Sequence, residues 1–348
     1  HVVWIYFYIK MTDVSLLRSL RQSNKYAEII KLGENMVLLT PSNPELYEEL
    51  CIAYWHMGRK RESYDCLDKI TLLRPISSDL IERCISNKLF FEEIHEKEKW
   101  TYPQTSSNIR NPVVTVTITS CKRLPLFLRT IDSFTRCCVD KHLIKEYICV
   151  DDNSSEQDRN EMLKYNFIRF IFKDPSDKGH VKSMQILVNE VKTPYMLHLE
   201  DDWLFFDRVS ISDMIEIMKN EANIQQVAIN KNYATCPKRI LGGEEKRTAG
   251  NLRYFLHEHC VTEQEKTDFV KKHGLGQSCN YWPHFTLQPS IINTEIFKNI
   301  QFERAPFFEM VFAEKFAKKG YKTAFVQGIT TRHIGYDDSA YSLNNDTR

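Results

Sequence analysis

The chain has 348 residues, of which 42% are hydrophobic and 27% are charged, and its 47 Lys and Arg residues against 46 Asp and Glu residues give a formal net charge of +1. This composition is that of a globular protein of about two domains. The balanced charge excludes a protein that binds nucleic acid through a broadly basic surface.

The first ten residues, HVVWIYFYIK, are strongly apolar and precede Met11. They are too few to span a membrane, which takes about 20 residues. They also lack the charged start and the cleavage site of a signal peptide. We interpret residues 1–11 as a non-native or leader segment, with a truncated membrane anchor as the alternative.

The ten cysteines form no C-x-x-C pair. This spacing argues against a zinc site and favours reduced, buried thiols in a cytoplasmic protein. With the short apolar start, the sequence therefore predicts a cytoplasmic location, and the alternative is association with a membrane through the truncated anchor.

Residues 12–100 have the apolar spacing of helices. Pro41 and Pro75 lie 34 residues apart, and Tyr47, Tyr54 and Gly58 between them fall at packing positions of a tetratricopeptide repeat, which this segment resembles. Such helix pairs bury their seam against the next pair. We expect a helical cap or a module for self-association or a protein partner, and a peptide-binding groove is the alternative.

Residues 101–111 are polar and form the expected linker to a domain over 112–348. From there on, strands alternate with helices, which predicts an α/β domain with a mostly parallel sheet and helices on both faces. Strands are expected at 112–123, 144–155, 167–174, 194–206 and 224–230, and helices at 124–138, 158–165, 178–192 and 209–222. Ligands of such sheets bind beyond the carboxyl ends of the strands.

Acidic residues follow two of these strands: Asp151 and Asp152 after the second, and Glu200, Asp201 and Asp202 after the fourth. The first pair could equally start a turn or cap a helix. Three acids beside a buried strand repel one another, and a divalent cation with a preference for oxygen ligands removes that cost. Alternation along the strand predicts that Glu200 and Asp202 point one way and Asp201 the other, unless the strand has already bent into its loop.

The order of VTVTITSCKR, VDDNSS, KGHVKSMQ, LHLEDDW, FFEMVFAEKFAKKG and TRHIG over residues 112–335 resembles GT-A glycosyltransferases, closest to the large inverting family that uses nucleotide-diphosphate sugars. The combination with a short repeat also resembles enzymes of large DNA viruses. The resemblance implies a nucleotide-sugar donor, with a UDP-sugar as the commonest case, and Mn²⁺ or Mg²⁺. The acceptor would be a glycan, a protein or a lipid.

Carried over residue by residue, the resemblance implies a role for each motif. Thr119, Arg123, Asp151 and Asp152 would contact the nucleotide, with Cys121 nearby. Lys178 and Gly179 would approach the donor. Glu200 and Asp201 would lie at the donor, and Asp202 and His333 would contact the metal.

Glu309, at the start of a predicted helix, is the candidate catalytic base, because inversion needs a carboxylate that takes the acceptor's proton. Glu314 is the alternative. Trp203, Tyr281, Trp282 and His284 are candidates for the acceptor site, although core packing explains such aromatics equally well.

Two other functions fit parts of this pattern. A nucleotidyltransferase would place a Gly-rich phosphate loop after the first strand, and TSCKRLPLF contains no Gly. A helical-repeat protein that binds nucleotide sugar without transfer is the non-enzymatic alternative.

Overall fold

The computed structural model describes residues 14–59, 62–63, 65–66, 69–70, 103–105, 109, 111–229, 244–272, 281–326 and 330–335. The chain divides into two compact units, His1–Lys99 and Trp100–Arg348. Segment 1–11 and most of the second half of the predicted repeat lie outside the described residues.

The first unit contains the helices α2 (Val14–Gln22), α3 (Tyr26–Leu39) and α4 (Pro44–His56). Helix α4 begins where its sequence predicts, because Pro44 occupies the first turn and the Asn43 side chain accepts a hydrogen bond from the N–H of Glu45. A Cβ on Gly33 of α3 would lie 2.6 Å from Leu50 of α4. The glycine thus allows the two helices to approach closely.

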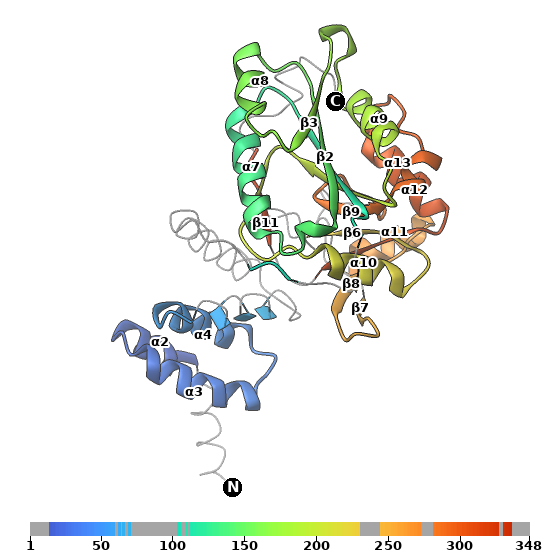
Figure 1. Ribbon diagram of the computed structural model, residues 1–348. Coiled ribbons are helices and arrows are strands. Elements are labelled where there is room, and N and C mark those ends of the chain that lie inside the picture. Colours follow the sequence, from blue (N-terminus) through green and yellow to red (C-terminus); the bar gives the residue numbers. More distant parts are fainter. Residues whose placement is uncertain are drawn as a thin grey trace, which may run out of the picture. The chain divides into compact units, whose positions relative to one another are not determined.

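The second unit is built on a nine-stranded sheet of order β3-β2-β1-β4-β9-β6-β10-β8-β7 (Figure 1). Strands β9 and β8 are antiparallel to their neighbours, and the other seven strands share one direction. The predicted mostly parallel sheet is therefore confirmed. The strands are β1 (Val114–Ser120), β2 (Ile144–Asp151), β3 (Ile168–Phe172), β4 (Tyr195–Glu200), β6 (Ile224–Ala228), β7 (Glu244–Arg247), β8 (Arg253–Leu256), β9 (Ser290–Asn293) and β10 (Lys322–Val326).

The predicted strand 194–206 is wrong in one respect, because it is two strands. Strand β4 ends at Glu200, Asp201 and Asp202 form a turn, and β5 (Trp203–Phe205) pairs separately with β11 (Thr331–His333). Residues of a turn do not alternate between the two faces of the sheet, so the side chains of Asp201 and Asp202 are not restricted to opposite faces.

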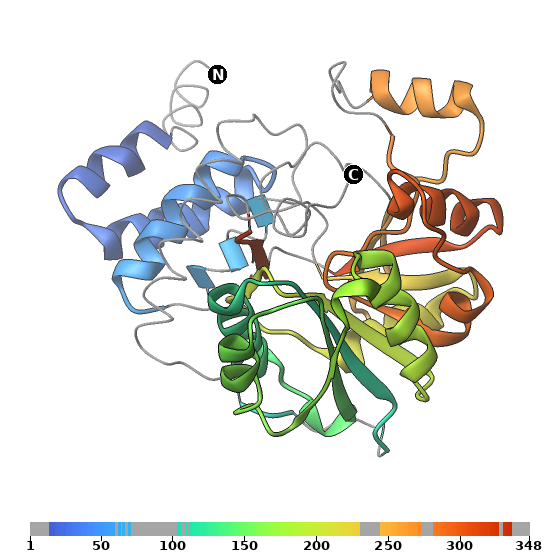
Figure 2. The ribbon, with the colours of Figure 1, turned by 90° about the horizontal axis from the view of Figure 1, so that it is seen from above.

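Helices cover both faces of the sheet, as the alternating pattern predicts. Figures 1 and 2 show α7 and α8 on one side of β1–β3 and α9, α12 and α13 on the other. The helices are α7 (Leu124–Cys137), α8 (Glu156–Met162), α9 (His180–Glu190), α10 (Ile211–Asn220), α11 (Glu263–Lys272), α12 (Thr294–Asn299) and α13 (Phe308–Lys318). No helix in the described part of the chain is both long enough and apolar enough to cross a membrane.

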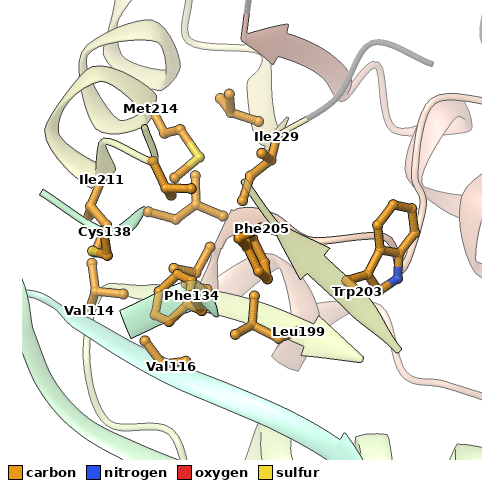
Figure 3. Close-up of a cluster of buried hydrophobic side chains, with 14 of the residues drawn as sticks. Val114, Val116, Phe134, Cys138, Leu199, Trp203, Phe205, Ile211, Met214 and Ile229 are labelled. Carbon is orange, nitrogen blue, oxygen red and sulfur yellow. The ribbon is translucent and has the colours of Figure 1, made fainter. Parts of the chain in front are cut away.

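Alternation along the strands gives each face its own core. Leu197 and Leu199 of β4 pack with Phe134 of α7 and Phe205 in one cluster, whose side chains Figure 3 shows. Met196, between the two leucines, belongs to the opposite cluster with side chains of α9, α12 and α13. The seven cysteines that the structure describes are buried and form no disulfide.

Candidate functional site

The carboxyl ends of β1, β2 and β4 lie side by side, and we call this edge of the sheet the carboxyl rim. In the strand register Thr119 of β1 pairs with Glu200 of β4, and Ser120 pairs with Asp151 of β2. Asp152 continues the pairing, since its N–H donates to the carbonyl of Ser120 over 2.7 Å. The two acidic clusters therefore converge on one edge, as the parallel sheet predicts. Thr119 itself is 8% exposed.

Arg123 joins the two aspartates of the turn after β4. Its Nη1 donates to Asp202 Oδ2 over 2.7 Å, and its Nη2 donates to Asp201 Oδ1. Asp201 also accepts from the N–H of Cys121 over 3.0 Å. The strand has already ended before Asp201, which is the alternative that the sequence left open, and both carboxylates turn toward the same guanidinium. The guanidinium of Arg123 therefore points at these two acids and not toward solvent.

Residues of the segment that follows β10 contact Asp202. Pairing of β11 with β5 sets His333 opposite Trp203, and His333 Nε2 lies 3.0 Å from Asp202 Oδ2. The N–H of Ile334 donates to the carbonyl of Asp202 over 2.8 Å, and a Cβ on Gly335 would lie 2.3 Å from Asp202 Oδ2. The glycine of TRHIG is thus needed for this close approach. The sequence analysis singled out the histidine of that motif but not Gly335.

The acids of the rim carry more negative charge than Arg123 neutralises. Burial, and then the charges of Asp202 and Glu309, raise the pKa of Glu200 well above its usual value. Burial also raises the pKa of Asp201, to about 6, although Arg123 opposes the shift. Burial alone would raise the pKa of Asp202, but the hydrogen bond with His333 and the charge of Arg123 hold it below the usual value. One Asp202 oxygen, Oδ1, is buried and has no hydrogen-bond partner.

These residues fit a divalent cation that takes its other ligands from a substrate. In the described part of the chain no group of three or more His, Cys, Asp or Glu side chains forms a complete metal cage. Mg²⁺ sites of enzymes that handle phosphates commonly use one or two carboxylates, with phosphate oxygens and water for the rest. Asp202 Oδ1 and the imidazole of His333 are the side-chain atoms that would hold such an ion.

Glu309 lies in the first turn of α13, and its Oε1 accepts a hydrogen bond from the N–H of Leu287 over 2.7 Å. Its charge is one of the causes of the raised pKa of Glu200, so the two carboxylates are near enough to interact. Glu314, the alternative base, is on the solvent-exposed side of the same helix. The structure thus brings Glu309, but not Glu314, toward the acids of the rim.

Asp151 serves the loop after β2. It is fully buried, it accepts hydrogen bonds from the N–H and Oγ of Ser154, and it pairs with Arg159 over 3.0 Å. These contacts hold the loop after β2 in place, and the nucleotide contact of Asp151 stays a prediction.

Asp152 is tied to the loop before α9. Its Oδ2 accepts from the N–H of Gly179 over 2.8 Å and pairs with Lys173 over 3.1 Å. Lys173 is buried and also donates to the carbonyl of Gly179 and to Ser183. Burial lowers the pKa of Lys173, although the charge of Asp152 opposes that shift. Lys173 does not stand out in the sequence, since a single lysine at a strand end carries no signal of burial.

Gly179 has a φ of 112°, which favours glycine, and it lets the chain enter α9 beside Asp152. Lys178 before it is solvent-exposed. His180 after it packs its ring edge against Phe308 of α13, with 5.3 Å between ring centroids. Its Nε2 is buried without a hydrogen-bond partner, and burial lowers its pKa to about 4.

The predicted acceptor aromatics are mostly parts of the core. Trp203, which is labelled in Figure 3, is fully buried and donates its indole N–H to Glu200. Tyr281 and His284 are 5% and 1% exposed, and their polar atoms bond to protein groups. The prediction is wrong for these three residues, because each ring packs inside the fold. Trp282 remains partly exposed, with its indole N–H bonded to the carbonyl of Phe285.

Comparison with known proteins agrees with this site. Residues 115–267 match the family model described as Glycosyl transferase family 2. The matched range includes β1, β2 and the acids after β4. The protein is a glycosyltransferase. No curated protein sequence matches the chain.

Solved structures give weaker likenesses. The mannosyltransferase PcManGT from Pyrobaculum calidifontis, solved with GDP-Man and Mn²⁺, is 11% identical with a TM-score of 0.47, over 79% of this chain and 71% of that protein. GalNAc-T7, solved with UDP, GalNAc and Mn²⁺, is 15% identical with a TM-score of 0.44, over 66% of this chain and 44% of that protein. The ligands named are those of the two other proteins.

Proposed function

We propose that the chain is a metal-dependent, inverting glycosyltransferase that moves a sugar from a nucleotide-diphosphate donor to an acceptor hydroxyl. The observation that carries this proposal is the excess of carboxylates at the carboxyl rim. The charges of Asp202 and Glu309 both raise the pKa of Glu200, and Asp202 Oδ1 is buried without a hydrogen-bond partner. A divalent cation would offset the repulsion among these carboxylates.

Each residue of the rim has a distinct part in the proposed reaction. Asp202 and His333 hold Mn²⁺ or Mg²⁺, which when bound offsets the negative charge of the nucleotide-diphosphate leaving group. Arg123 holds Asp202 through Oδ2, and Oδ1 is the oxygen of this carboxylate that would contact the ion. Asp201 anchors Arg123 from the other side.

The donor's nucleotide lies, in this proposal, along Thr119, Asp152 and the loop of Lys178 and Gly179. The contacts of Asp152 with Gly179 and Lys173 support this placement, because they bring the loop to the ends of β1 and β2. UDP is the commonest nucleotide of such enzymes and is the first donor to test.

Glu309 acts as the general base. Its Oε1 accepts a hydrogen bond from the N–H of Leu287, which fixes the direction of the carboxylate. The base takes the proton as the hydroxyl oxygen attacks the anomeric carbon, and the bond to the diphosphate breaks on the opposite side. The transferred sugar therefore has the inverted configuration at its anomeric carbon.

A panel of UDP- and GDP-sugars, each incubated with Mn²⁺, with Mg²⁺ or with a chelator, tests this function. We expect metal-dependent release of the nucleoside diphosphate, and NMR of a transferred sugar should show inversion at the anomeric carbon. If no nucleotide sugar is turned over and none binds in a metal-dependent way, the non-enzymatic alternative replaces this proposal.

For the first unit we propose self-association through the repeat-like helices. The exposed leucines of α3, at 38% for Leu32, 80% for Leu38 and 42% for Leu39, support an apolar contact surface. Sedimentation of the full chain and of Leu38→Glu tests it, and an unchanged mass distribution would count against it. We also propose a cytoplasmic location, since the ten cysteines include no C-x-x-C pair and the seven described ones are buried.

A further inference from the structure

Phe307 combines exposure with an unfavourable backbone conformation. Its side chain is 72% exposed, and its backbone is left-handed, with φ 53° and ψ 43°. This region is costly for a residue with a Cβ, and Asn tolerates it better than large apolar residues do. Of the other non-glycine residues with positive φ in the described ranges, three are Asn and one is Lys122.

The fold holds Phe307 in this conformation from both sides. Its carbonyl accepts from the N–H groups of Met310 over 2.8 Å and Val311 over 3.2 Å, which starts α13. Phe308 is buried and packs against His180 and Phe302. Phe308 is thus packed in the core, whereas Phe307 remains exposed to solvent. An exposed ring adds little to stability, so strain at this position points to a function.

Phe307 lies beside the candidate base. Glu309 is two positions further along the chain, a span of at most about 7 Å between the two Cα atoms. Its neighbour Phe308 contacts His180. His180 directly follows Lys178 and Gly179, the loop at which the donor is proposed to bind. The acceptor hydroxyl must come to Glu309, so the acceptor must lie near this end of α13.

We propose that Phe307 is the platform on which the acceptor binds, and that the acceptor is a sugar whose apolar C–H face stacks on the Phe307 ring. The inference rests on the proposed function and adds the chemical class of the acceptor. A pyranose presents such a face, and its hydroxyls lie at the ring edge within reach of Glu309. Phe307 takes the part that the sequence analysis gave to Trp203, Tyr281 and His284.

Acceptor kinetics of the full chain with a panel of pyranosides test the proposal. We expect Phe307→Ala to raise the acceptor KM about tenfold, the loss of ~1.4 kcal/mol of binding, with less than about twofold change in the donor KM. Phe307→Trp should keep the acceptor KM. The matched control is Phe167→Ala. Phe167 is 46% exposed, but it precedes the amino end of β3 and is therefore at the end of that strand opposite to the carboxyl rim.

Phe307→Gly separates function from stability. Glycine accepts the left-handed backbone, so the melting temperature should rise while the acceptor KM rises as it does for Phe307→Ala. A lower melting temperature would show that the ring stabilises the fold and would overturn the inference. So would an unchanged acceptor KM in Phe307→Ala, or an equal change in Phe167→Ala.

Failure of the two proposals can be told apart. A wild-type chain that turns over no nucleotide sugar contradicts the proposed function. A wild-type chain that transfers sugar, but only to non-carbohydrate acceptors, contradicts this inference alone.

Discussion

Replacement of Arg123 by methionine should destabilise the second unit by about 3–5 kcal/mol, the cost of breaking a buried ion pair by removal of one partner. The side chain of Arg123 is 9% exposed, and those of its partners Asp201 and Asp202 are 1% and 8% exposed. Methionine fills a similar volume but leaves two buried carboxylates without a cation. A domain's whole stability is only about 5–15 kcal/mol, so the loss is large.

Arg169→Met is the matched control. Arg169 also contacts two acids, Glu190 over 2.9 Å and Glu146 over 3.6 Å, but its side chain is 46% exposed. Exposed pairs contribute about 0–1 kcal/mol, because water solvates the charges that remain. The two variants thus remove the same kind of side chain with the same number of partners and differ in burial.

Hydrogen exchange measured by mass spectrometry on peptides of β1 and β4 is the suitable assay, because a chain of two units does not unfold in one two-state step. Exchange in Arg123→Met should be about 10²- to 10³-fold faster than in the wild type, at ~1.4 kcal/mol per factor of ten. A second replacement, Asp201→Asn, should restore part of the loss. Equal effects of Arg123→Met and Arg169→Met would refute the reasoning from burial.

Three further predictions concern the site and the core. Asp202→Asn should abolish metal-dependent turnover, and isothermal titration should show loss of Mn²⁺ binding in the presence of nucleoside diphosphate while the circular dichroism spectrum is kept. Glu309→Gln should lower kcat by about 10²- to 10⁴-fold, with donor KM nearly unchanged; equal kcat would move the base elsewhere. Burial holds the pKa of His284 well below its usual value. Below pH ~6.5 the unfolded chain therefore takes up a proton that the folded chain does not. The free energy of unfolding should decrease as the pH is lowered, by up to ~1.4 kcal/mol per pH unit. Chemical denaturation as a function of pH should show a shallower fall for His284→Gln, and parallel curves would contradict this.

The parallel sheet and the meeting of the two acidic clusters followed from the sequence. β-branched runs such as VTVTITS alternate with helices that carry their own start signals, Pro125 in α7 and Ser155 before α8. These signals are local, so the chain itself reveals them. Once strands are parallel, their carboxyl ends must share an edge, and Asp152 and Asp202 must lie near one another.

The partner of each side chain did not follow from the sequence. Arg123 and Asp202 are 79 residues apart, and His333 and Asp202 are 131 apart. The sequence determined the element types, the edge that carries the acids and the candidate base Glu309. Only the tertiary structure decided that Trp203, Tyr281 and His284 are buried, that Asp151 and Lys173 serve the loops, and that Phe307 is exposed. Burial depends on packing between distant segments, whereas periodicity along the chain reports only local conformation.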